Sequence, residues 1–329
     1  MRVGVIGTGF ASTHIEWIHS GPKWQITELA YARRSDRAVE LARRYGIERI
    51  ITDGSELAGS DDLDVVVVAS PPETHEHFAL AAIERGRIVV CEKPLAHTAT
   101  AAQRLSAAAT GHGVRTMVCF QWRENEAFGL LRKHIDDGSA GDLVGLELSF
   151  HHDFLAGPAT AWPWRHQVAT AGAGALGDLG VHLFDLLTWI TSLDWTVIGT
   201  RIRMPWRERI ADGKSVAGET DDFALVDLED GTGSVIAQIC TSRASPGFRR
   251  ISVTAVCTRA TLRATADPSD GSAYFERLGA GALQCEFPPS SMNPYIRLAT
   301  DLATNAHTVP NFADGLHAQR LLATATVLN

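Results

Sequence analysis

Hydrophobic residues in the first 120 positions gather in short runs, and the segments between the runs repeat apolar residues at helical spacing. The clearest run, at 63–69, contains four consecutive valines, which indicates a strand buried on both faces, as in a parallel sheet. Further strands are predicted at 2–6, 25–32, 49–52, 87–91 and 114–120, with helices after residue 12 and at 36–45, 74–85 and 98–110. Strands alternating with helices predict an α/β domain with a doubly wound parallel sheet of the Rossmann type.

The second half of the chain shows a different pattern, in which strands follow one another with turn residues between them. These strands are predicted at 143–150, 197–204, 222–228, 233–241, 251–257 and 261–265. Helices are predicted at its edges, at 126–137, 292–305 and 313–326, and over the stretch that contains residues 178–185. The pattern indicates an α+β domain with a large, mainly antiparallel open sheet. We therefore expect two domains, with limits at 1–121 and 122–329.

Composition supports this division and excludes some classes of partner. A length of 329 residues favours two domains, and 45% hydrophobic with 21% charged residues is ordinary for a globular protein. A net charge of −8 argues against a nucleic-acid or anionic-membrane partner. No apolar run is long enough for a membrane span, and the N-terminus lacks a signal-peptide pattern, so we expect a cytoplasmic protein. The scattered cysteines are expected to be reduced thiols, at 91, 119, 240, 257 and 285.

A glycine turn follows the first strand. The segment Gly7-Thr8-Gly9-Phe10-Ala11-Ser12 lies between a strand and a helix, where the dinucleotide fingerprint G-x-G-x-x-G occurs. Gly7 would allow the tight turn, and Gly9 would let the backbone approach a pyrophosphate. Ser12 stands at the third glycine position and makes the match imperfect. The residues expected to bind the cofactor here are Gly7, Thr8, Gly9, Phe10 and Ala11.

The end of the second strand bears on which cofactor is bound. NAD-binding versions of this fold carry an acidic residue about 20 positions after the glycines, whereas this chain has Ala32-Arg33-Arg34-Ser35 before the first acid, Asp36. Arginine suits the 2′-phosphate of NADP because it forms charge-assisted hydrogen bonds. We therefore expect NADP, with NAD as the alternative, bound through Arg33, Arg34 and Ser35. The other interpretation is that these arginines only decorate the start of a helix.

A later strand ends on a polar motif. The strand at 87–91 is followed by Glu92-Lys93-Pro94, and proline ends the strand because it lacks an N–H group. Open parallel sheets bind ligands at the carboxyl ends of their strands. A solvated Glu92–Lys93 ion pair is the commoner fate of such a dipeptide. The sequence does not decide whether the Lys93–Pro94 peptide is cis.

A third motif follows the glycine-rich run at 171–177. Asp178, His182 and Asp185 are spaced i, i+4 and i+7, which would place them on one helical face beside a flexible loop. A histidine can exchange protons near neutral pH, and Asp178 could orient it or the substrate. The structural interpretation is a capping aspartate and a core histidine. No metal site is predicted, because no second helix supplies matching ligands.

The order and spacing of these motifs resemble the glucose–fructose oxidoreductase / inositol dehydrogenase / MocA (Gfo/Idh/MocA) family over essentially the whole chain. The motifs are the glycine turn, Ser70-Pro71-Pro72-Glu73-Thr74-His75, Glu92-Lys93-Pro94 and the stretch 174–182, whereas Glu126 stands where the family commonly has proline. The resemblance implies catalytic roles for Lys93, Asp178 and His182. It also implies further cofactor contacts at Ser70, Pro71, His75, Glu92, Lys93, Trp164 and Arg165, and substrate contacts at Lys93, Arg123, Trp164, Asp178 and His182.

The resemblance implies an NADP-dependent oxidoreductase acting on a secondary alcohol or ketone of a sugar, inositol or related cyclic polyol. Trp122, Trp162 and Trp164 could offer flat faces to a sugar ring. The family typically covers its open sheet face with another subunit, which implies a homodimer or homotetramer. Two other functions stay open on the sequence alone: a non-catalytic dinucleotide sensor, and an NAD-assisted glycoside hydrolase on the same fold. The substrate and the direction of the reaction are not identified.

Overall fold

The computed structural model describes residues 1–328, which form two compact units. The first unit contains Met1–Phe120 and Asn293–Gln319, and the second contains Gln121–Met292 and the residues from Arg320 onward. By packing, residues 293–319 thus belong with the first unit. The expected domain limits, at 1–121 and 122–329, remain a prediction.

The first unit is built on a six-stranded parallel sheet with the order β3-β2-β1-β4-β5-β6. This is the strand order of a doubly wound dinucleotide-binding fold, and it confirms the predicted Rossmann type. All four valines of β4 are fully buried, as their run predicted. The strands are β1 (Arg2–Ile6), β2 (Gln25–Ala30), β3 (Arg49–Ile51), β4 (Val65–Val68), β5 (Ile88–Cys91) and β6 (Thr116–Val118).

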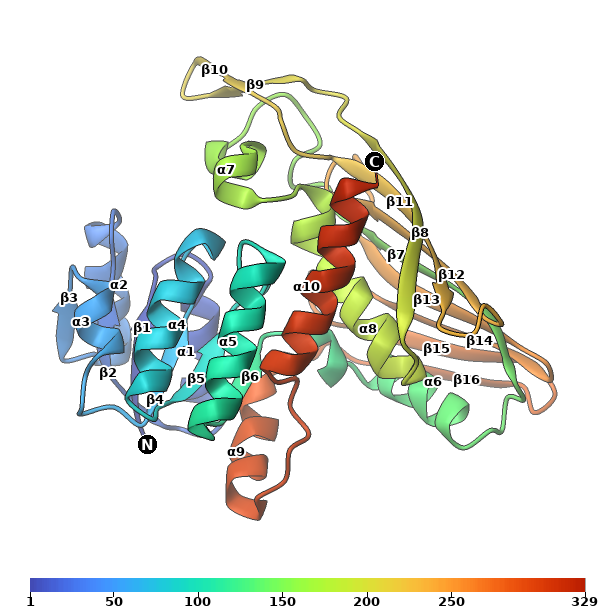
Figure 1. Cartoon of the computed structure of the whole chain (residues 1–329), viewed down its shortest axis with the longest axis horizontal. Helices are drawn as coiled ribbons and strands as arrows, with labels where there is room; N and C mark the ends of the chain where they lie inside the picture. Colours follow the sequence, from blue (N-terminus) through green and yellow to red (C-terminus); the bar gives the residue numbers. More distant parts are fainter. Residues whose placement is uncertain (329) are drawn as a thin grey trace. The chain divides into compact units, whose positions relative to one another are not determined.

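Helices cover both faces of this sheet. One hydrophobic cluster joins α1 (Ala11–Ser20), α2 (Ser35–Tyr45) and α9 (Pro294–Thr304) to the strands. On the opposite face α3 (Gly54–Ala58), α4 (His75–Glu84) and α5 (Ala99–His112) pack in sequence order (Figure 1). The short helix η1 (Pro72–Thr74) leads into α4, and α10 (Phe312–Val327) is the last helix of the chain. No helix within residues 1–328 combines the length and the apolar character that a membrane crossing requires.

The second unit contains an eight-stranded sheet with the order β16-β15-β14-β13-β7-β12-β11-β8. All neighbouring pairs are antiparallel except β12 and β7, which confirms the predicted mainly antiparallel sheet. The strands are β7 (Leu143–His151), β8 (Trp195–Arg203), β11 (Phe223–Asp230), β12 (Ile236–Ser242), β13 (Arg250–Cys257), β14 (Ala260–Ala266), β15 (Ala273–Gly279) and β16 (Leu283–Phe287). A separate hairpin joins β9 (Glu208–Ala211) to β10 (Lys214–Ala217).

Helices cover one face of the large sheet. α6 (Glu126–Asp136), α8 (Val181–Thr191) and the π-helical turn η4 (Leu176–Gly180) pack against its strands. On β11 the inward residues Ala224, Val226 and Leu228 are buried, whereas their neighbours in sequence are half-buried on the other face. The remaining short elements are η2 (Gln121–Glu124), η3 (Pro163–His166) and α7 (Val168–Ala171). All five cysteines are free thiols, as expected.

Candidate functional site

The glycine turn of the first unit has the shape that a bound pyrophosphate requires. Gly7 has φ +119°, and a Cβ atom there would lie 2.4 Å from the carbonyl oxygen of Ala69, so only glycine fits. Gly9 is exposed, and a Cβ atom on it would meet nothing within 4 Å. No side chain caps the N-terminus of α1, and no acidic residue stands in its first turn. The N–H groups of Gly7 and Ser12 donate to the carbonyl oxygens of Ala30 and Gly9, and no capping side chain occupies the start of the helix, which fits a dinucleotide cofactor.

Arg37, which the sequence did not single out, lies against this turn. Its Nε donates to the carbonyl oxygen of Thr8 at 2.7 Å, and its Nη2 donates to Ser12 Oγ at 3.1 Å. Ser12 at the third glycine position thus has a local partner for its hydroxyl. Of the residues expected to bind the 2′-phosphate, Arg33, Arg34 and Ser35 are all exposed, and Arg34 makes a surface contact with Asp36.

His75 ties together the loops that follow β4 and β5. Its Nε2 lies 2.8 Å from the carbonyl oxygen of Ser70, and its Nδ1 lies 3.0 Å from that of Pro94. The side chain is fully buried, and this burial lowers the pKa of His75. The structure therefore gives His75 a bracing role between two loops; its contact with cofactor stays a prediction. The Lys93–Pro94 peptide is cis.

Glu92 does not form the solvated pair that its sequence context suggested. It is buried, its Oε1 lies 2.9 Å from Nε2 of His14, and its Oε2 accepts the backbone N–H of Lys93 at 3.1 Å. Burial raises the pKa of Glu92, but the hydrogen bond from His14 and the charges of His14, Lys93 and His75 outweigh it, so the pKa is lowered overall. Glu92 is therefore a buried carboxylate directly beside Lys93, which is half-buried.

One cluster among residues 1–328 has the composition of a metal site. Ligand atoms of His14, Glu92 and Cys119 lie within 4.8 Å of one another. Both ring nitrogens of His14 already have partners, Glu92 and the hydroxyl of Tyr295, and burial raises the pKa of the Cys119 thiol well above its usual value. Because metals bind the thiolate, a neutral thiol and an engaged imidazole fit a hydrogen-bonded cluster better than a metal site.

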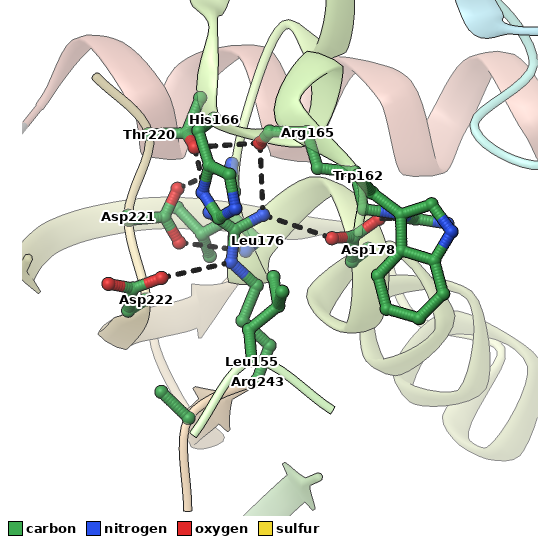
Figure 2. Close-up of polar contacts among 12 residues, drawn as sticks. Leu155, Trp162, Arg165, His166, Leu176, Asp178, Thr220, Asp221, Asp222 and Arg243 are labelled. Atoms are coloured by element: carbon green, nitrogen blue, oxygen red, sulfur yellow. Dashed lines mark hydrogen bonds and ion pairs between the residues drawn. The ribbon is translucent and has the colours of Figure 1, made fainter. Parts of the chain in front are cut away.

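In the second unit, Asp178 binds two arginines. Arg165 Nη1 donates to its Oδ1, and Arg243 Nη1 donates to its Oδ2 at 3.1 Å (Figure 2). Arg243 is completely buried and also donates to Thr220 Oγ1 at 2.7 Å and to Asp222 Oδ1 at 3.2 Å. Arg243 therefore joins η4 to the segment before β11, and nothing in the sequence pattern marked it.

The glycine-rich run before Asp178 is tightly packed rather than flexible. Asp221 accepts the backbone N–H of Gly174 at 2.7 Å and that of Leu176 at 2.9 Å. A Cβ atom on Gly174 would lie 1.8 Å from the carbonyl oxygen of Asp221. The glycine-rich run is therefore not the flexible loop that was expected. Gly174 is needed because two backbone segments approach closely there.

The helical stretch that carries Asp178, His182 and Asp185 begins with a π-helical turn that continues directly into α8, and the shared face of the three residues stays a prediction. Asp178 belongs to the π-helical turn η4, whereas His182 and Asp185 belong to α8. Asp185 forms a two-point ion pair with Arg123, at 2.9 and 2.5 Å, and both residues are buried. This gives Arg123 a structural role, and its expected contact with substrate stays a prediction. His182 is 3% exposed, and its ring is tilted against Phe150.

Aromatic side chains surround Arg165. Its guanidinium carbon lies 4.6 Å from the ring centre of Trp164. The ring centres of Phe154 and Trp162 are further away, at 5.8 and 6.0 Å. Trp162 is 43% exposed and therefore keeps a face open to a ligand. Trp122, in contrast, is buried edge-on against Phe128 and Phe150, so it is a core residue.

His166 is buried beside the same charged groups. Its Nε2 lies 3.1 Å from Thr160 Oγ1. Burial, together with the positive charges of Arg243 and Arg209, lowers the pKa of His166 to about 4. Arg209 is also completely buried and donates to Asp222 at 2.6 Å. His166 is therefore neutral at neutral pH, and it is a fixed structural residue and not a proton carrier.

Comparisons with known proteins agree with these observations. Residues 1–120 match the family model described as the oxidoreductase family with an NAD-binding Rossmann fold, and residues 128–263 match the GFO/IDH/MocA C-terminal domain. A levoglucosan dehydrogenase of Pseudarthrobacter phenanthrenivorans is 30% identical over 198 residues, 58% of this chain and 51% of the relative. An inositol 2-dehydrogenase of Acidothermus cellulolyticus is 32% identical over 232 residues, 70% of this chain and 60% of the relative.

The fold extends further than these alignments. A solved levoglucosan dehydrogenase in complex with NADH and levoglucosan superposes with a TM-score of 0.88 and covers 100% of this chain and 98% of that one. At 21% identity, this likeness establishes the fold. The sequence alignments themselves span only about half to two thirds of the curated relatives.

Proposed function

The chain belongs to the GFO/IDH/MocA oxidoreductase family, and from this membership we propose that it transfers a hydride between a nicotinamide dinucleotide and a secondary alcohol or ketone of a sugar, inositol or related cyclic polyol. The observation that carries the proposal is the open, uncapped start of α1 behind Gly9, which fits a pyrophosphate. The names of relatives that act on levoglucosan and inositol support the class of substrate.

The cofactor, when bound, supplies or accepts the hydride. The residues of the chain then have to manage the hydroxyl proton. In our proposal His182 takes or gives this proton, and Lys93 hydrogen-bonds the reacting oxygen and shares the proton transfer. Asp178 is assigned to positioning the substrate, because a carboxylate that already binds Arg165 and Arg243 is stabilised in its charged form and is a weak base.

We also propose that NADP is preferred over NAD. Arg33 and Arg34 are exposed at the end of β2, and Arg37 adds a third guanidinium that is fixed against the glycine turn. No acidic residue stands between β2 and α2, where an NAD-binding protein would hold the ribose hydroxyls. The positive charge favours a 2′-phosphate by about 1.5–3 kcal/mol for one good charge-assisted bond.

One experiment tests both proposals. Levoglucosan, inositols and simple sugars are offered with NADP or NAD, and formation of the reduced cofactor is followed by its absorbance. We expect at least about a tenfold higher kcat/KM with NADP, and Arg34→Ser should reduce that ratio. Lys93→Ala and His182→Ala should lower kcat by about 100-fold or more while cofactor binding survives. Full activity in either alanine variant would contradict the assigned roles, and a tenfold preference for NAD would contradict the cofactor assignment.

The oligomer is a separate proposal. The uncovered face of the eight-stranded sheet carries half-buried serine and threonine side chains and the exposed apolar residues Ile236 and Val256. A face of this kind suits contact with a second copy of the chain. We propose a homodimer or homotetramer formed through this face.

A further inference from the structure

Three buried polar side chains of the first unit form a continuous chain of hydrogen bonds that the proposed reaction does not yet use. Tyr295 on α9 places its hydroxyl 2.7 Å from Nδ1 of His14 on α1, and Nε2 of His14 lies 2.9 Å from Oε1 of Glu92. Tyr295 and His14 have no exposed surface, and Glu92 is 7% exposed. We call these residues the Tyr295–His14–Glu92 triad.

The direction of the hydrogen bonds in the triad follows from what each group can donate. An ionised carboxylate only accepts, so Nε2 of His14 carries the proton that Glu92 receives. Burial raises the pKa of the Tyr295 hydroxyl well above its usual value, so the tyrosine keeps its proton and can donate it to Nδ1. A protonated tyrosine hydroxyl, an imidazole with its proton on Nε2 and an anionic carboxylate therefore satisfy both hydrogen bonds of the triad.

The triad ends at Lys93. The second carboxylate oxygen of Glu92 accepts the backbone N–H of Lys93 at 3.1 Å. The other titratable groups near Glu92 are His75, Cys91 and Cys119. Burial lowers the pKa of His75, although the hydrogen bonds to the carbonyl oxygens of Ser70 and Pro94 oppose this shift, and burial raises the pKa of both thiols, which keeps the thiols neutral. Glu92 thus contributes a negative charge beside the Lys93 ammonium.

We propose that Tyr295 and His14 are positioning residues that hold the Glu92 carboxylate against Lys93, and that they thereby fix the orientation and the charge of this lysine. A group with neither solvent nor a fixed partner would turn among several rotamers, and a buried carboxylate without donors would tend to take up a proton. The triad prevents both. Its bearing on catalysis rests on the proposed function, in which Lys93 handles the hydroxyl proton.

The sequence makes a direct test practical, because the chain contains only four lysines, Lys23, Lys93, Lys133 and Lys214. Each can be followed by mass spectrometry after brief labelling with an amine-reactive reagent between about pH 7 and pH 11, which spans the usual lysine pKa. The midpoint of Lys93 labelling reports its charge without any substrate. Lys133, which pairs with Asp137 on the surface, serves as the internal reference.

We expect Glu92→Gln to move the midpoint of Lys93 to lower pH by about 0.5–1 unit, because the ammonium loses its nearby negative charge. His14→Leu should move it in the same direction, and Tyr295→Phe, which removes a single oxygen atom and is the mildest change to the fold, should move it least. If His14 acts through Glu92, adding His14→Leu to Glu92→Gln should produce no further shift. His19→Leu on the exposed side of the same helix is the matched control.

Kinetics supply the second readout. With a substrate in hand, Tyr295→Phe and His14→Leu should lower kcat by about 3-fold and 10-fold or more, with cofactor affinity unchanged within about twofold. Variants that lose thermal stability but keep the parent labelling midpoint and kcat would show that the triad only holds α1 and α9 in place, and the proposal would be wrong. If Lys93→Ala keeps full activity while the triad variants shift the labelling midpoint of Lys93, the role of the triad is supported and the proposed function is overturned.

Discussion

At the scale of single residues, the second unit is unusual in burying two guanidinium groups completely, those of Arg209 and Arg243. Asp222 receives hydrogen bonds from both, and Asp178 shares Arg243 with Arg165. Buried charges are tolerated only when they are paired and hydrogen-bonded, which these are. The consequence is a network of paired charges in which Arg165 and Arg243 hold the carboxylate of Asp178.

The same buried arginines give His166 a shifted pKa, whose effect on stability can be measured. An unfolded histidine titrates near pH 6.5, whereas the pKa of folded His166 is lowered to about 4. Between these values the unfolded chain binds a proton that the folded protein does not. The contribution of His166 to the free energy of unfolding is therefore fully present above about pH 6.5. It falls by about 1–3 kcal/mol as the pH drops toward 4.

Urea unfolding of the parent and of His166→Gln at several pH values checks this expectation. Glutamine keeps a polar nitrogen near Thr160 but cannot be protonated. The difference in unfolding free energy between the two proteins should therefore change between pH 6.5 and 4 and be constant above pH 7. A constant difference over the whole range would show that the buried arginines do not suppress the charge of His166.

Single residues also show which candidates a local motif can point to, although the roles assigned to them stay predictions. Gly7, Lys93, Asp178 and His182 belong to local motifs, so each was proposed from a few neighbouring positions. Arg37, Arg243 and Tyr295 were not, because the groups that they contact stand 25, 65 and 281 positions away, respectively. No periodicity or spacing rule connects such positions, and only the folded chain brings them together.

At the scale of elements, the strands with strong patterns were predicted and the weak ones were not. The valine run of β4 and the alternation of β11 come from burial, which the sequence records directly. β16 at the edge of the sheet has no fully buried residue, and its sequence shows no clear alternation. The β9–β10 hairpin, which was not predicted, turns at Asp212-Gly213, and both residues have positive φ, as an Asp-Gly hairpin turn requires.

The π-helical turn η4 illustrates a limit of helical spacing. Positions i, i+4 and i+7 share a face only on a regular α-helix. Asp178 lies in a wider turn, just before α8, where its carboxylate accepts hydrogen bonds from Arg165 and Arg243, whereas the carboxylate of Asp185 accepts from Arg123. The residue types indicated polar chemistry, but the spatial arrangement of their side chains could be obtained only from the structure.

The close approach of Gly174 and Asp221 is an element-scale feature with a sharp test. A Cβ atom at 174 would meet backbone atoms, which cannot move aside as a flexible side chain can. Gly174→Ala should therefore lower the unfolding free energy by about 2–4 kcal/mol and disturb η4. Gly129→Ala in α6, where a Cβ atom meets nothing within 4 Å, is the matched control and should be neutral or stabilising by about 0.5–1 kcal/mol. Equal stability of the two variants would mean that the backbone at 174 can relax.

At the scale of the whole molecule, both fold classes followed from the pattern because alternating and successive strands require different layers. The assignment of residues 293–319 to the first unit did not. The helices at the end of the chain are recognisable by their apolar spacing, but that spacing does not say which sheet they cover. Because the sequence does not place α9 on the first sheet, it also does not predict that Tyr295 completes the triad beside Lys93.

The uncovered face of the eight-stranded sheet leads to the last prediction. Ser149 and Ser252 meet at its centre with their hydroxyl oxygens 2.8 Å apart, while Ile251 and Val253 on either side of Ser252 are buried on the covered face. An arginine at 252 would therefore project from the uncovered face. If two copies meet there, Ser252→Arg should convert an oligomer, seen by size-exclusion chromatography with light scattering, into monomers without loss of secondary structure. Ser20→Arg, at the exposed end of α1, should leave the mass unchanged. A parent protein that is monomeric at micromolar concentration would show instead that solvent covers this face, which its hydroxyl groups and its Arg263–Glu276 and Arg201–Asp227 pairs would then serve to keep soluble.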